Sequence, residues 1–563
     1  MSAAVPFGDR ALLVRTADVA SAHALAARVT DDRDAGRAPQ PVVEVVVGFA
    51  TVLVVFDPGP TAEDGERCAA WLDELAGAAG SGVVAFPPAT HRLPVVFDGA
   101  DLEEAADLAG VDPARLVDLL VGADLEVAFV GFAPGFPYLT GLPAELAALP
   151  RRPTPRTTVP PGSVAVAGGF ASVYPRATPG GWHLLGRTTV ALFDPVRPPH
   201  SRVAPGDRVR FTVADPGADD RAGAHPPVVL RPLLAAATGP YLEVLDPGLL
   251  STVQDAGRDD AARLGVPRAG AADPEALAVV NLLLGNPADA PAIECTAAGP
   301  TVRVVGNGHV AVVGDGTGAV DVHVDGRTVP DGTVIPVDDG QVVAVGPVRR
   351  GLRAYLGVAG GLRTPVLFGS HSSDLLAGLG PGRLRTGDRL ARGLPGRVRG
   401  RLHPSASPTG VDDRTGAARL RVLAGPHARA GNGPGVARFE ELVATPWRVA
   451  GDVDRIGVRL HPAGGAVSPG PPPGDSTPMV TGAVQLPPDG RPIVLSVDHA
   501  TVGGYPVVAC VISADLPRLG QLRPGDAVTL VAVDDAVAAR ARAAALAAPA
   551  TRVSGWFPTA AGT

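Results

Sequence analysis

The chain has 563 residues, several times the usual size of one domain, so we expect three or four compact units. Its 49 basic and 57 acidic residues give a formal charge of -8, and the sequence has no basic run of the kind that binds nucleic acid, so we expect no nucleic-acid partner. All basic residues are arginine, which excludes a Walker A lysine, a biotinyl-lysine carrier and a lysine Schiff base within this chain.

Strand-like and helix-like runs alternate over residues 1–85, which predicts a small α+β domain at the N-terminus of a mostly β chain. Aromatic residues make up only 4% of the chain, while Val, Ala, Leu, Gly and Pro dominate, and this composition favours short strands and frequent turns. The strands expected in this domain cover 11–14, 42–47 and 51–56, and the helices cover 19–29 and 62–76.

From His91 onward, Pro and Gly interrupt apolar runs at short intervals, which is typical of β-barrels and sandwiches. One helix is expected over 101–120, because Asp101 is a good N-cap. The expected divisions are a β-unit over 86–214, a linker over 215–238, β-units over 239–400 and 401–535, and a C-terminal helix and tail over 536–563. Within these divisions we expect a loose stretch over 392–418, a loop over 469–477 and an alanine-rich helix over 535–547.

The sequence indicates a cytoplasmic protein without a membrane partner. Residues 1–10 lack a basic segment followed by an apolar one, and Glu44 and Gly48 interrupt the most apolar stretch. Three cysteines lie far apart, so we expect no disulfide and no structural zinc, and we predict no metal-ligating residues. Each of these cysteines is expected to be a small buried apolar residue: Cys68, Cys295 and Cys510.

A double glycine followed by a Gly-Asp turn occurs three times, which predicts three related β-units. We expect the three aspartates to cap their own turns, whereas the double glycines could serve either ligand binding or close packing. The copies are Gly180-Gly181 with Asp207, Gly360-Gly361 with Asp388, and Gly503-Gly504 with Asp526.

The first half resembles the B subunit of 5-oxoprolinase, a family that also contains the kinase inhibitor KipI and is also known as allophanate hydrolase subunit 1. The motifs that carry this resemblance are Gly131-Phe-Ala-Pro-Gly-Phe-Pro-Tyr-Leu139, Thr154-Pro-Arg156, Val159-Pro-Pro-Gly-Ser163, Ser172-Val-Tyr-Pro175, Pro179-Gly-Gly-Trp182 and Gly186-Arg-Thr188.

The second half resembles the C subunit of 5-oxoprolinase, the KipA or allophanate hydrolase subunit 2 family, and the two resemblances together cover about residues 5–535. The motifs are Leu250-Ser-Thr-Val-Gln-Asp-Ala-Gly-Arg258, Gly265-Val-Pro267, Gly270-Ala-Ala-Asp273, Asn281, Gly285-Asn286, Glu294, Gly299-Pro300, Asp454-Arg455-Ile-Gly457, Gly482-Ala-Val-Gln485 and Asp498-His-Ala-Thr-Val-Gly-Gly-Tyr505. The sequence is therefore identified as a natural fusion of the two small subunits.

The resemblance implies a ferredoxin-like domain followed by cyclophilin-like β-barrels. It also implies that the chain works with a separate third polypeptide, the A subunit, to open 5-oxoproline to glutamate at the expense of ATP, with Mg²⁺. Two alternatives remain open: a carboxyltransferase half that takes its carboxyl group from a biotin carrier in trans, and a KipI-like module that binds a histidine kinase. Homo-oligomerisation also stays open.

A site for this chemistry needs cations for phosphate, a carboxylate and backbone N–H groups, and in this chain only arginine can supply the cations. For catalysis we favour Asp498, Gln485, Arg258 and Asp255. Binding of substrate or nucleotide is assigned to motif residues of both halves: Gly135, Phe136, Tyr138, Arg156, Gly162, Ser163, Gly180, Gly181, Trp182, Arg187, Gln254, Glu294, Arg455, His499, Thr501, Gly503, Gly504 and Tyr505.

Some of these assignments leave alternatives. Asp498 and His499 cannot both enter one pocket if they lie on a strand, unless the chain turns there, and we favour Asp498. Glu294 is either buried and paired or a pocket carboxylate. The sequence also departs from the family patterns at Leu120-Val-Gly122, at His371 and at Val507, and these departures put activity in question.

Overall fold

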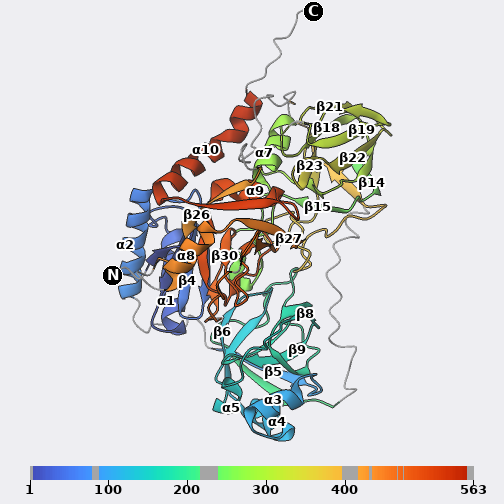
Figure 1. Cartoon of the computed structure of the whole chain (residues 1–563). Coiled ribbons are helices and arrows are strands. Elements are labelled where there is room, and N and C mark those ends of the chain that lie inside the picture. The colour runs from blue at the N-terminus through green and yellow to red at the C-terminus, as the bar shows by residue number, and fades with distance from the viewer. Residues whose placement is uncertain are drawn as a thin grey trace, which may run out of the picture.

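The computed structural model describes residues 4–78, 88–215, 239–395, 398, 416–429 and 434–554, apart from 317, 466 and 473. Strands hold 35% of the residues and helices 21%, so the predicted mostly β fold with barrels is confirmed. Figure 1 shows the N-terminal domain beside a central barrel, a second β-unit below this barrel and a third at the upper right. No helix in the described residues is long and apolar enough to span a membrane.

The N-terminal domain is a four-stranded antiparallel sheet with two helices on one face, in the strand order β1-β2-β4-β3. Asp18 caps the first helix by accepting a hydrogen bond from the Ser21 backbone N–H at 2.7 Å. The elements are β1 (Ala4–Pro6), β2 (Ala11–Arg15), α1 (Val19–Asp34), β3 (Val42–Gly48), β4 (Thr51–Phe56) and α2 (Ala62–Ala78).

Both faces of this sheet are buried. Leu12 and Val54 point to the side that carries α1 and α2, whereas Leu13 and Leu53 point to the opposite side, as the alternation of side chains along a strand requires. The second side packs on apolar residues of the second half of the chain: Ala262, Met479, Ala483, Leu495, Val507 and Cys510. The small domain is thus joined to the barrel by a continuous apolar core.

The unit over residues 88–215 is built on a seven-stranded sheet in the order β12-β9-β10-β7-β6-β13-β5, with a two-stranded sheet β11-β8 beside it. Its elements are β5 (Thr90–Val95), α3 (Leu102–Ala109), α4 (Pro113–Gly122), β6 (Leu125–Val130), β7 (Pro137–Thr140), α5 (Ala144–Ala147), β8 (Arg156–Val159), β9 (Ser163–Ala167), β10 (Phe170–Val173), β11 (Thr178–Gly180), β12 (His183–Arg187) and β13 (Arg208–Val213).

The prediction of one helix over 101–120 was wrong, because α3 ends and α4 begins inside this range. Gly110 takes a left-handed backbone conformation with φ of 70°, which terminates α3. Asp112 then caps α4 through the Arg115 N–H at 2.8 Å, and Pro113 occupies its first turn. The Asp101 side chain makes no cap hydrogen bond; its carboxylate instead binds Arg152, Arg156 and the Leu184 N–H.

The next unit distributes its strands over a seven-stranded and a five-stranded sheet that enclose one apolar core. Its elements are β14 (Tyr241–Asp246), β15 (Leu250–Gln254), η1 (Ala262–Leu264), α7 (Pro274–Leu283), β16 (Ala292–Thr296), β17 (Thr301–Val305), β18 (Gly308–Val313), β19 (Val320–Val324), β20 (Arg327–Val329), β21 (Ile335–Val337), β22 (Val342–Val348), β23 (Arg353–Val358), β24 (Leu362–Arg363) and β25 (Arg389–Arg392).

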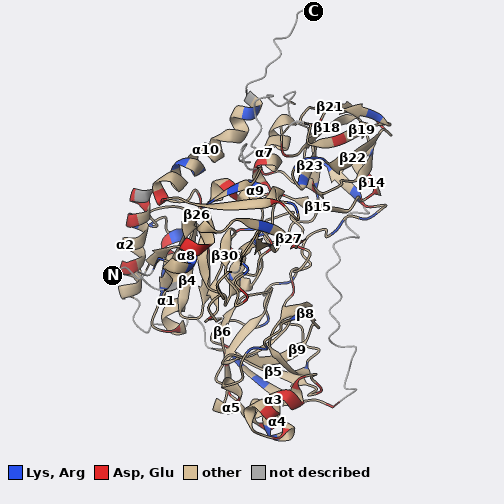
Figure 2. Ribbon diagram, viewed as in Figure 1, with Lys and Arg blue, Asp and Glu red and all other residues tan. Residues whose placement is uncertain are grey.

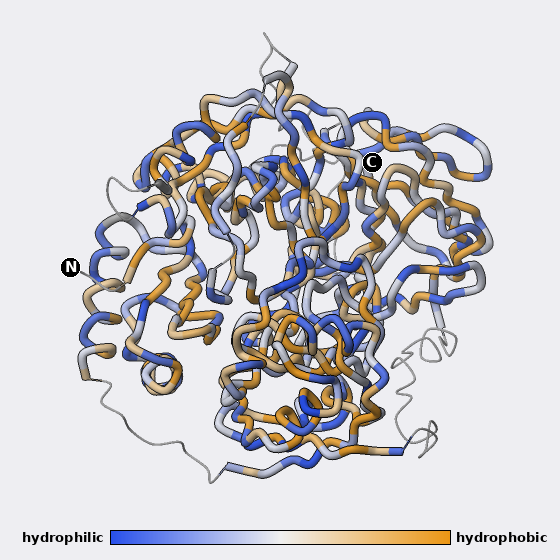
Figure 3. Tube along the Cα trace, turned by 60° about the horizontal axis from the view of Figure 1, so that its bottom comes forward, coloured by the Kyte–Doolittle hydropathy of each residue, from blue (hydrophilic) through white to orange (hydrophobic). Residues whose placement is uncertain are grey.

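The last unit is a closed seven-stranded barrel in the order β26-β33-β30-β31-β28-β27-β34. Its elements, with the C-terminal helix, are β26 (Ala418–Ala424), α8 (Pro434–Ala444), β27 (Trp447–Val453), β28 (Gly457–Pro462), β29 (Thr477–Pro478), β30 (Ala483–Gln485), β31 (Ile493–Leu495), β32 (Val502–Gly503), β33 (Val507–Val511), η2 (Ser513–Asp515), α9 (Leu516–Gln521), β34 (Ala527–Ala532) and α10 (Asp535–Ser554). Figure 3 shows apolar segments along the strands of these units and polar residues at many outer turns.

The repeated Gly-Asp elements are turns, as predicted. Asp207, Asp388 and Asp526 each accept a hydrogen bond from the backbone N–H three residues earlier, at 2.9, 2.8 and 2.8 Å. The preceding glycine has a φ of 87° or 88° in all three copies. Each turn leads directly into a strand, and the three strands are β13, β25 and β34.

The prediction of three related units needs a correction, because only two of them close in the same way. In all three units this strand lies beside the first strand of the unit, and it is parallel to that strand in two of them, where β13 pairs with β5 and β34 pairs with β26. β25 instead pairs antiparallel with β14. The shared turn therefore marks a local similarity in all three units and a shared strand arrangement only in the first and the last.

Helix α10 connects distant parts of the molecule, running from the side of α2 to α7 in Figure 1. Near its middle, buried Arg542 donates to the Gly59 and Pro60 carbonyls at 2.6 and 2.7 Å and forms an ion pair with Asp9 at 3.2 Å. At its far end, Arg552 pairs with Glu275 of α7 at 2.8 Å. The charged residues of α2 are mostly acidic and those of α10 are mostly arginine (Figure 2).

Candidate functional site

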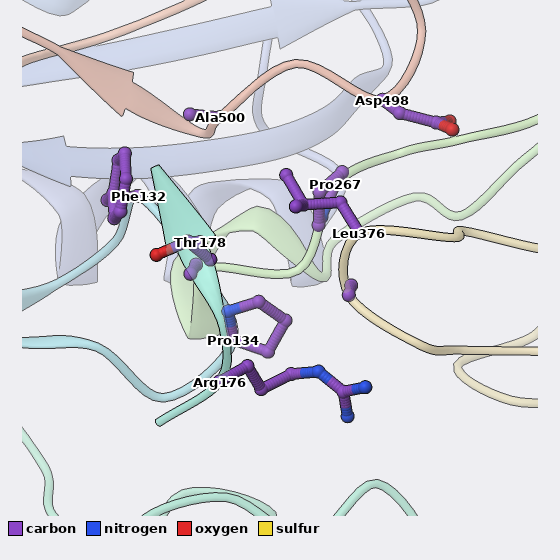
Figure 4. A pocket seen from close by; sticks show the side chains of 10 residues that line it. Phe132, Pro134, Arg176, Thr178, Pro267, Leu376, Asp498 and Ala500 are labelled. Atoms are coloured by element: carbon purple, nitrogen blue, oxygen red, sulfur yellow. The ribbon is translucent and has the colours of Figure 1, made fainter. Parts of the chain in front are cut away.

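A pocket lies where the two halves of the chain meet (Figure 4). The pocket is narrow, and its free interior has room for about one water molecule. The first half contributes Phe132, Ala133, Pro134, Arg176 and Thr178, and the second half contributes Pro267, Leu376, Ala377, Asp498 and Ala500. Neither half forms this pocket alone.

Backbone contacts between the halves fix the two walls of the pocket. Thr501 accepts a hydrogen bond from the Phe132 N–H at 3.1 Å, and the Gly135 N–H donates to the Leu264 carbonyl at 2.9 Å. Gly131 lies so close to Val502 that a Cβ at position 131 would come within 2.9 Å of its side chain. The Gly-Phe motif of the first half is therefore a docking loop for the second half.

The central feature behind the pocket is a buried ion network around Arg455. This guanidinium donates to both oxygens of Asp498 at 2.9 Å each, to Glu294 at 2.7 Å and to the Gly270 carbonyl at 2.7 Å. Burial would lower the pKa of Arg455, but the two carboxylates outweigh burial and raise it. Three residues predicted from separate motifs are thus brought together: Glu294, Arg455 and Asp498.

Glu294 is buried and paired, which decides between the two alternatives left by the sequence. Besides Arg455, it accepts hydrogen bonds from the Tyr355 hydroxyl at 2.7 Å and from the Ala272 N–H at 2.9 Å. Burial would raise the pKa of Glu294, but Arg455 and Arg353 outweigh burial and hold it below its ordinary value. Glu294 is therefore a charged partner that holds Arg455 in place.

The network continues from Tyr355 to Asp273, the N-cap of α7. The Asp273 carboxylate accepts hydrogen bonds from the Ala276 N–H at 2.9 Å and from the Gln521 side chain at 2.7 Å. Its backbone N–H donates to the Tyr355 hydroxyl at 2.8 Å. Burial outweighs these donors and raises the pKa of Asp273 from 3.8 to about 7.

We expect Asp273 to make stability fall as pH rises. A carboxyl with a raised folded-state pKa favours folding while it is protonated, so its contribution is lost between pH 3.8 and about 7. Relative to Asp273→Asn, which keeps a capping side chain, the wild type should lose roughly 1.4 kcal/mol per pH unit over this window. Urea unfolding at pH 5, 6 and 7 measures this difference, and equal pH slopes in the two proteins would contradict it.

A second carboxylate, Asp374, lies behind the pocket near Asp498. It accepts a hydrogen bond from the Ala377 N–H at 2.8 Å through Oδ1, and so holds the loop that carries Leu376 and Ala377 in the pocket wall. Burial raises the pKa of Asp498 to about 7 against the effect of Arg455, and Asp374 contributes to the rise. Burial also raises the pKa of Asp374. Two carboxylates in one low-dielectric site do not both ionise easily, so this pair can hold a proton near neutral pH.

Several buried polar atoms at this junction have no protein partner within the described residues. They are Oγ1 of Thr178, Oδ2 of Asp374, and Nε and Nη1 of Arg258. Buried polar groups are hydrogen-bonded in the large majority of cases, and those left without a protein partner need an explanation such as a ligand or ordered water. Among these residues Thr178 lines the pocket, so its hydroxyl is the group that a polar ligand or a water molecule in the pocket can reach.

Arg176, Thr178 and Asp374 were missed from the sequence. Arg176 directly follows the Ser172-Val-Tyr-Pro175 motif, and Asp374 directly follows Gly369-Ser-His-Ser-Ser373. The charge of Arg176 and of Asp374 directly after a family motif was the feature of the sequence that could have pointed to them. Sequence spacing alone could not bring Arg176 and Thr178 together with the loop that Asp374 holds, because they belong to different halves of the chain.

The Gln254 to Arg258 segment lies behind the pocket and holds a loop of the second half in place. Asp255 accepts hydrogen bonds from the Ser370 and Ser372 hydroxyls at 2.6 and 2.5 Å and from the His371 N–H at 2.6 Å. Arg258, only 1% exposed, donates to the Ser372 carbonyl, and burial lowers its pKa. Gln254 is buried and donates to the Ser373 carbonyl at 2.9 Å.

The contacts of the Gln254 to Arg258 segment explain how a departure from the family pattern is tolerated. Asp255 binds His371 through the backbone N–H, which any residue type other than proline would supply. The imidazole of His371 contacts the Thr364 carbonyl at 2.9 Å and does not line the pocket. The hydrogen bond from position 371 to Asp255 therefore does not depend on the His371 side chain.

The aromatic motif residues of the first half form a cluster beside the pocket. Phe136 and Tyr138 are buried, and each lies edge-to-face with Trp182 at centroid distances of 5.6 and 5.7 Å. Gly180 packs directly on Tyr174, where a Cβ would come within 2.9 Å of the ring. These residues support the pocket wall rather than face the pocket, and the double glycine here serves packing.

Other predicted residues of the first half lie away from the pocket. Arg156 pairs with Asp101 at 2.6 Å, and Arg187 pairs with Asp98 at 3.0 Å on the surface. Gly162, Ser163 and Gly181 also do not line the pocket. The Ser163 hydroxyl donates to the Pro160 carbonyl, and a Cβ at Gly162 would collide with the Thr188 carbonyl, so both shape a turn.

The chain turns at Asp498, so Asp498 and His499 diverge. Asp498 lines the pocket, while the buried His499 ring contacts the Ala500 carbonyl at 2.8 Å, and burial lowers the pKa of His499. Gln485 is buried and donates to the Met479 sulfur at 3.5 Å, close to Gly503. Neither Gln485 nor the remaining predicted residues Gly503, Gly504 and Tyr505 line the pocket.

The pocket residues do not fit a complete Mg²⁺-ATP. The free interior of the pocket lies far below the roughly 300–1,000 Å³ of typical small-molecule pockets. The described residues contain no group of three His, Cys, Asp or Glu side chains that could hold a metal ion. Any ligand larger than water requires the side chains of this pocket to move, and a small polar molecule requires less movement than a nucleotide.

Comparison with known proteins agrees with the division into two halves. Residues 3–203 match the family model of the carboxyltransferase domain, subdomains C and D, and residues 264–532 match that of subdomains A and B. The C subunit of 5-oxoprolinase from Escherichia coli is 35% identical over 306 residues, which covers 53% of this chain and 94% of that protein. The chain belongs to the family of 5-oxoprolinase small subunits, as a fusion of the B and C subunits.

Further members of the family extend the comparison. The B subunit of 5-oxoprolinase from Escherichia coli O157:H7 is 41% identical over 177 residues, covering 30% of this chain and 77% of that protein. The urea amidolyase of Saccharomyces cerevisiae is 30% identical over 315 residues, or 52% of this chain but only 16% of that protein. The crystal structure of TTHA0988 covers 93% of this chain and 99% of its own, with 33% identity and a TM-score of 0.76. The two-half arrangement is therefore shared with a solved structure.

Proposed function

We propose that this chain is a component of an ATP-dependent 5-oxoprolinase, which converts 5-oxo-L-proline, ATP and water to L-glutamate, ADP and phosphate together with a separate third subunit. The observation that carries the proposal is the pocket at the junction of the two halves, with Asp498 in its wall and Arg455 behind it. The names of the relatives, the B and C subunits of 5-oxoprolinase, support the substrate and the need for a partner.

The chemistry of the pocket suits a small amide. Asp498 has a pKa raised to about 7 by burial, and a carboxyl that gains and loses a proton near neutral pH can act as a general base for attacking water. Phe132, Pro134 and Leu376 line the pocket with apolar surface, which keeps the local dielectric low. ATP with Mg²⁺ is proposed to enter at the contact with the third subunit, since the pocket is too small for it.

We expect Asp498→Asn to lower kcat by at least about 100-fold, because an amide cannot accept the proton. In the wild type, kcat/KM should rise with pH through about 7, where the Asp498 carboxyl loses its proton. The assay mixes the purified chain with the third subunit, 5-oxo-L-proline, Mg²⁺ and ATP and measures glutamate and ADP. A wild type without turnover would overturn the proposed function.

Asp498 also pairs with the buried Arg455, so the free energy of unfolding of Asp498→Asn is measured beside the assay, and a second carboxylate-to-amide variant at an exposed position is the control for activity. Asp454→Asn serves this purpose, because Asp454 lies outside the pocket and caps the Ile456 and Gly457 N–H groups at 2.8 and 2.9 Å, which an asparagine can also do. Full activity of Asp498→Asn with an unchanged pH profile would show that another group is the base.

A carboxyltransferase reaction is the second candidate, supported by the description of both matching family models and by the urea amidolyase relative. In this reaction the same pocket would accept a carboxyl group from a biotin carrier supplied in trans, because the chain has no lysine to carry biotin. Decarboxylation of carboxybiotin by the chain, without turnover of 5-oxo-L-proline, would favour this candidate.

A kinase-binding module receives less support. That function requires the Gly-Phe-x-Pro-Gly-Phe loop to be available to a partner, but Phe136 of this loop is only 1% exposed. The loop also binds the second half of the same chain through Phe132 and Gly135. Its docking partner is therefore already present in the molecule.

A further inference from the structure

Arg176 is the cation of the first half that reaches the pocket. Its side chain extends toward the side of the pocket where Leu376 lies (Figure 4). Burial lowers the pKa of Arg176, and the attraction of Asp374 acts in the opposite direction. Within the described residues, no carboxylate or carbonyl oxygen forms a hydrogen bond or an ion pair with this guanidinium. A half-buried arginine in this state can donate hydrogen bonds to water or to a ligand in the pocket.

The surrounding backbone makes room for this guanidinium. A Cβ at Gly378 would lie within 2.6 Å of the Arg176 Cζ and would push the guanidinium away from its present place, and the φ of 62° also favours glycine here. Gly378 belongs to the loop that Asp374 holds through the Ala377 N–H. The second half therefore fixes the place of a cation that comes from the first half.

The charges around the pocket favour an anionic ligand. The cluster contains four arginines and four carboxylates: Arg176, Arg258, Arg353 and Arg455, and Asp255, Asp374, Asp498 and Glu294. When one proton is held by Asp374 or Asp498, the cluster carries one positive charge in excess. A carboxylate bound at Arg176 restores the balance in a low-dielectric site.

We propose that Arg176 is a specificity-determining residue, which anchors the carboxylate of the substrate and so orients its amide toward Asp498. Thr178 lines the same pocket with a buried hydroxyl that has no protein partner among the described residues, and it supplies a neutral hydrogen-bonding group for the ligand. The identity of the substrate as 5-oxo-L-proline rests on the proposed function, whereas the preference for a carboxylate rests on Arg176.

The test compares two ligands that differ only in the carboxylate. Isothermal titration calorimetry of the full chain, with and without the third subunit, measures the affinity for 5-oxo-L-proline and for 2-pyrrolidinone. We expect Arg176→Ala to bind 5-oxo-L-proline roughly 10- to 100-fold more weakly and 2-pyrrolidinone as the wild type does. Gly378→Ala, which displaces the guanidinium but keeps its charge, should weaken 5-oxo-L-proline binding in the same direction. Arg210→Ala, an exposed arginine of the same half, serves as the control.

Three outcomes would overturn this inference: a wild type that does not bind 5-oxo-L-proline, an Arg176→Ala variant that binds it unchanged, or an equal loss for both ligands. The fate of the proposed function is decided separately by the glutamate assay. If binding depends on Arg176 but the wild type shows no turnover, the proposed function is refuted and the inference about Arg176 stands. If the wild type turns over and Arg176→Ala has an unchanged KM, the proposed function stands and the inference is refuted.

Discussion

Arg455→Met is expected to destabilise the second half of the chain by about 3–5 kcal/mol, because it leaves Asp498 and Glu294 buried without their shared cation. When one partner of a buried ion network is removed, the remaining charges keep their desolvation cost without the attraction that offset it. Arg455 also donates to the Gly270 carbonyl, so the loop that precedes α7 loses a hydrogen bond as well. Urea unfolding followed by circular dichroism measures the change.

Arg459→Ala is the matched control, because Arg459 is an exposed arginine only four residues away, on β28. Its removal should change the stability by no more than about 0.5 kcal/mol. An Arg455→Met variant as stable as the control would show that the network contributes little to folding.

Leu13→Asp is expected to detach the N-terminal domain from the barrel, at a cost of at least about 4 kcal/mol. Leu13 is 1% exposed and faces the barrel residues Met479 and Leu495. A carboxylate there has no partner and would have to be hydrated, which requires the two surfaces to separate. Hydrogen exchange of β30 and β33 should increase in this variant.

Arg15→Asp provides the comparison on the same strand, since Arg15 is exposed at the end of β2. The two substitutions introduce the same charged group at neighbouring places on one strand, and only the buried position should open the interface. Unchanged exchange in Leu13→Asp would show that the barrel face does not depend on the sheet.

Local patterns in the sequence predicted many elements correctly. The alternating apolar runs at 11–14, 42–47 and 51–56 became β2, β3 and β4, because a sheet buried on both faces needs apolar residues at nearly every position. The three Gly-Asp turns followed from local chemistry alone. The helix over 101–120 was wrong because a left-handed glycine at 110 can end one helix while Asp112 starts another.

The site was predictable only in part. Asp498, Arg455 and Glu294 come from three distant motifs, and the sequence named all three but could not show that they touch. Asp255 and Arg258 carry charges suited to catalysis, yet the fold uses them to hold the Ser370 to Ser373 loop. Which charged residue faces a pocket depends on how the halves dock, and no local pattern encodes that.

The apolar contact between the N-terminal sheet and the barrel has a consequence for the fusion itself. The two halves adhere through a surface that includes Leu13, Val46 and Leu53 on one side, independently of the covalent connection. A break in the chain between residues 215 and 239 would therefore leave them associated, and the connection acts by raising the effective concentration of one half near the other. Joining the two halves in one polypeptide fixes their ratio at one to one. Each molecule is therefore synthesised with both walls of the pocket.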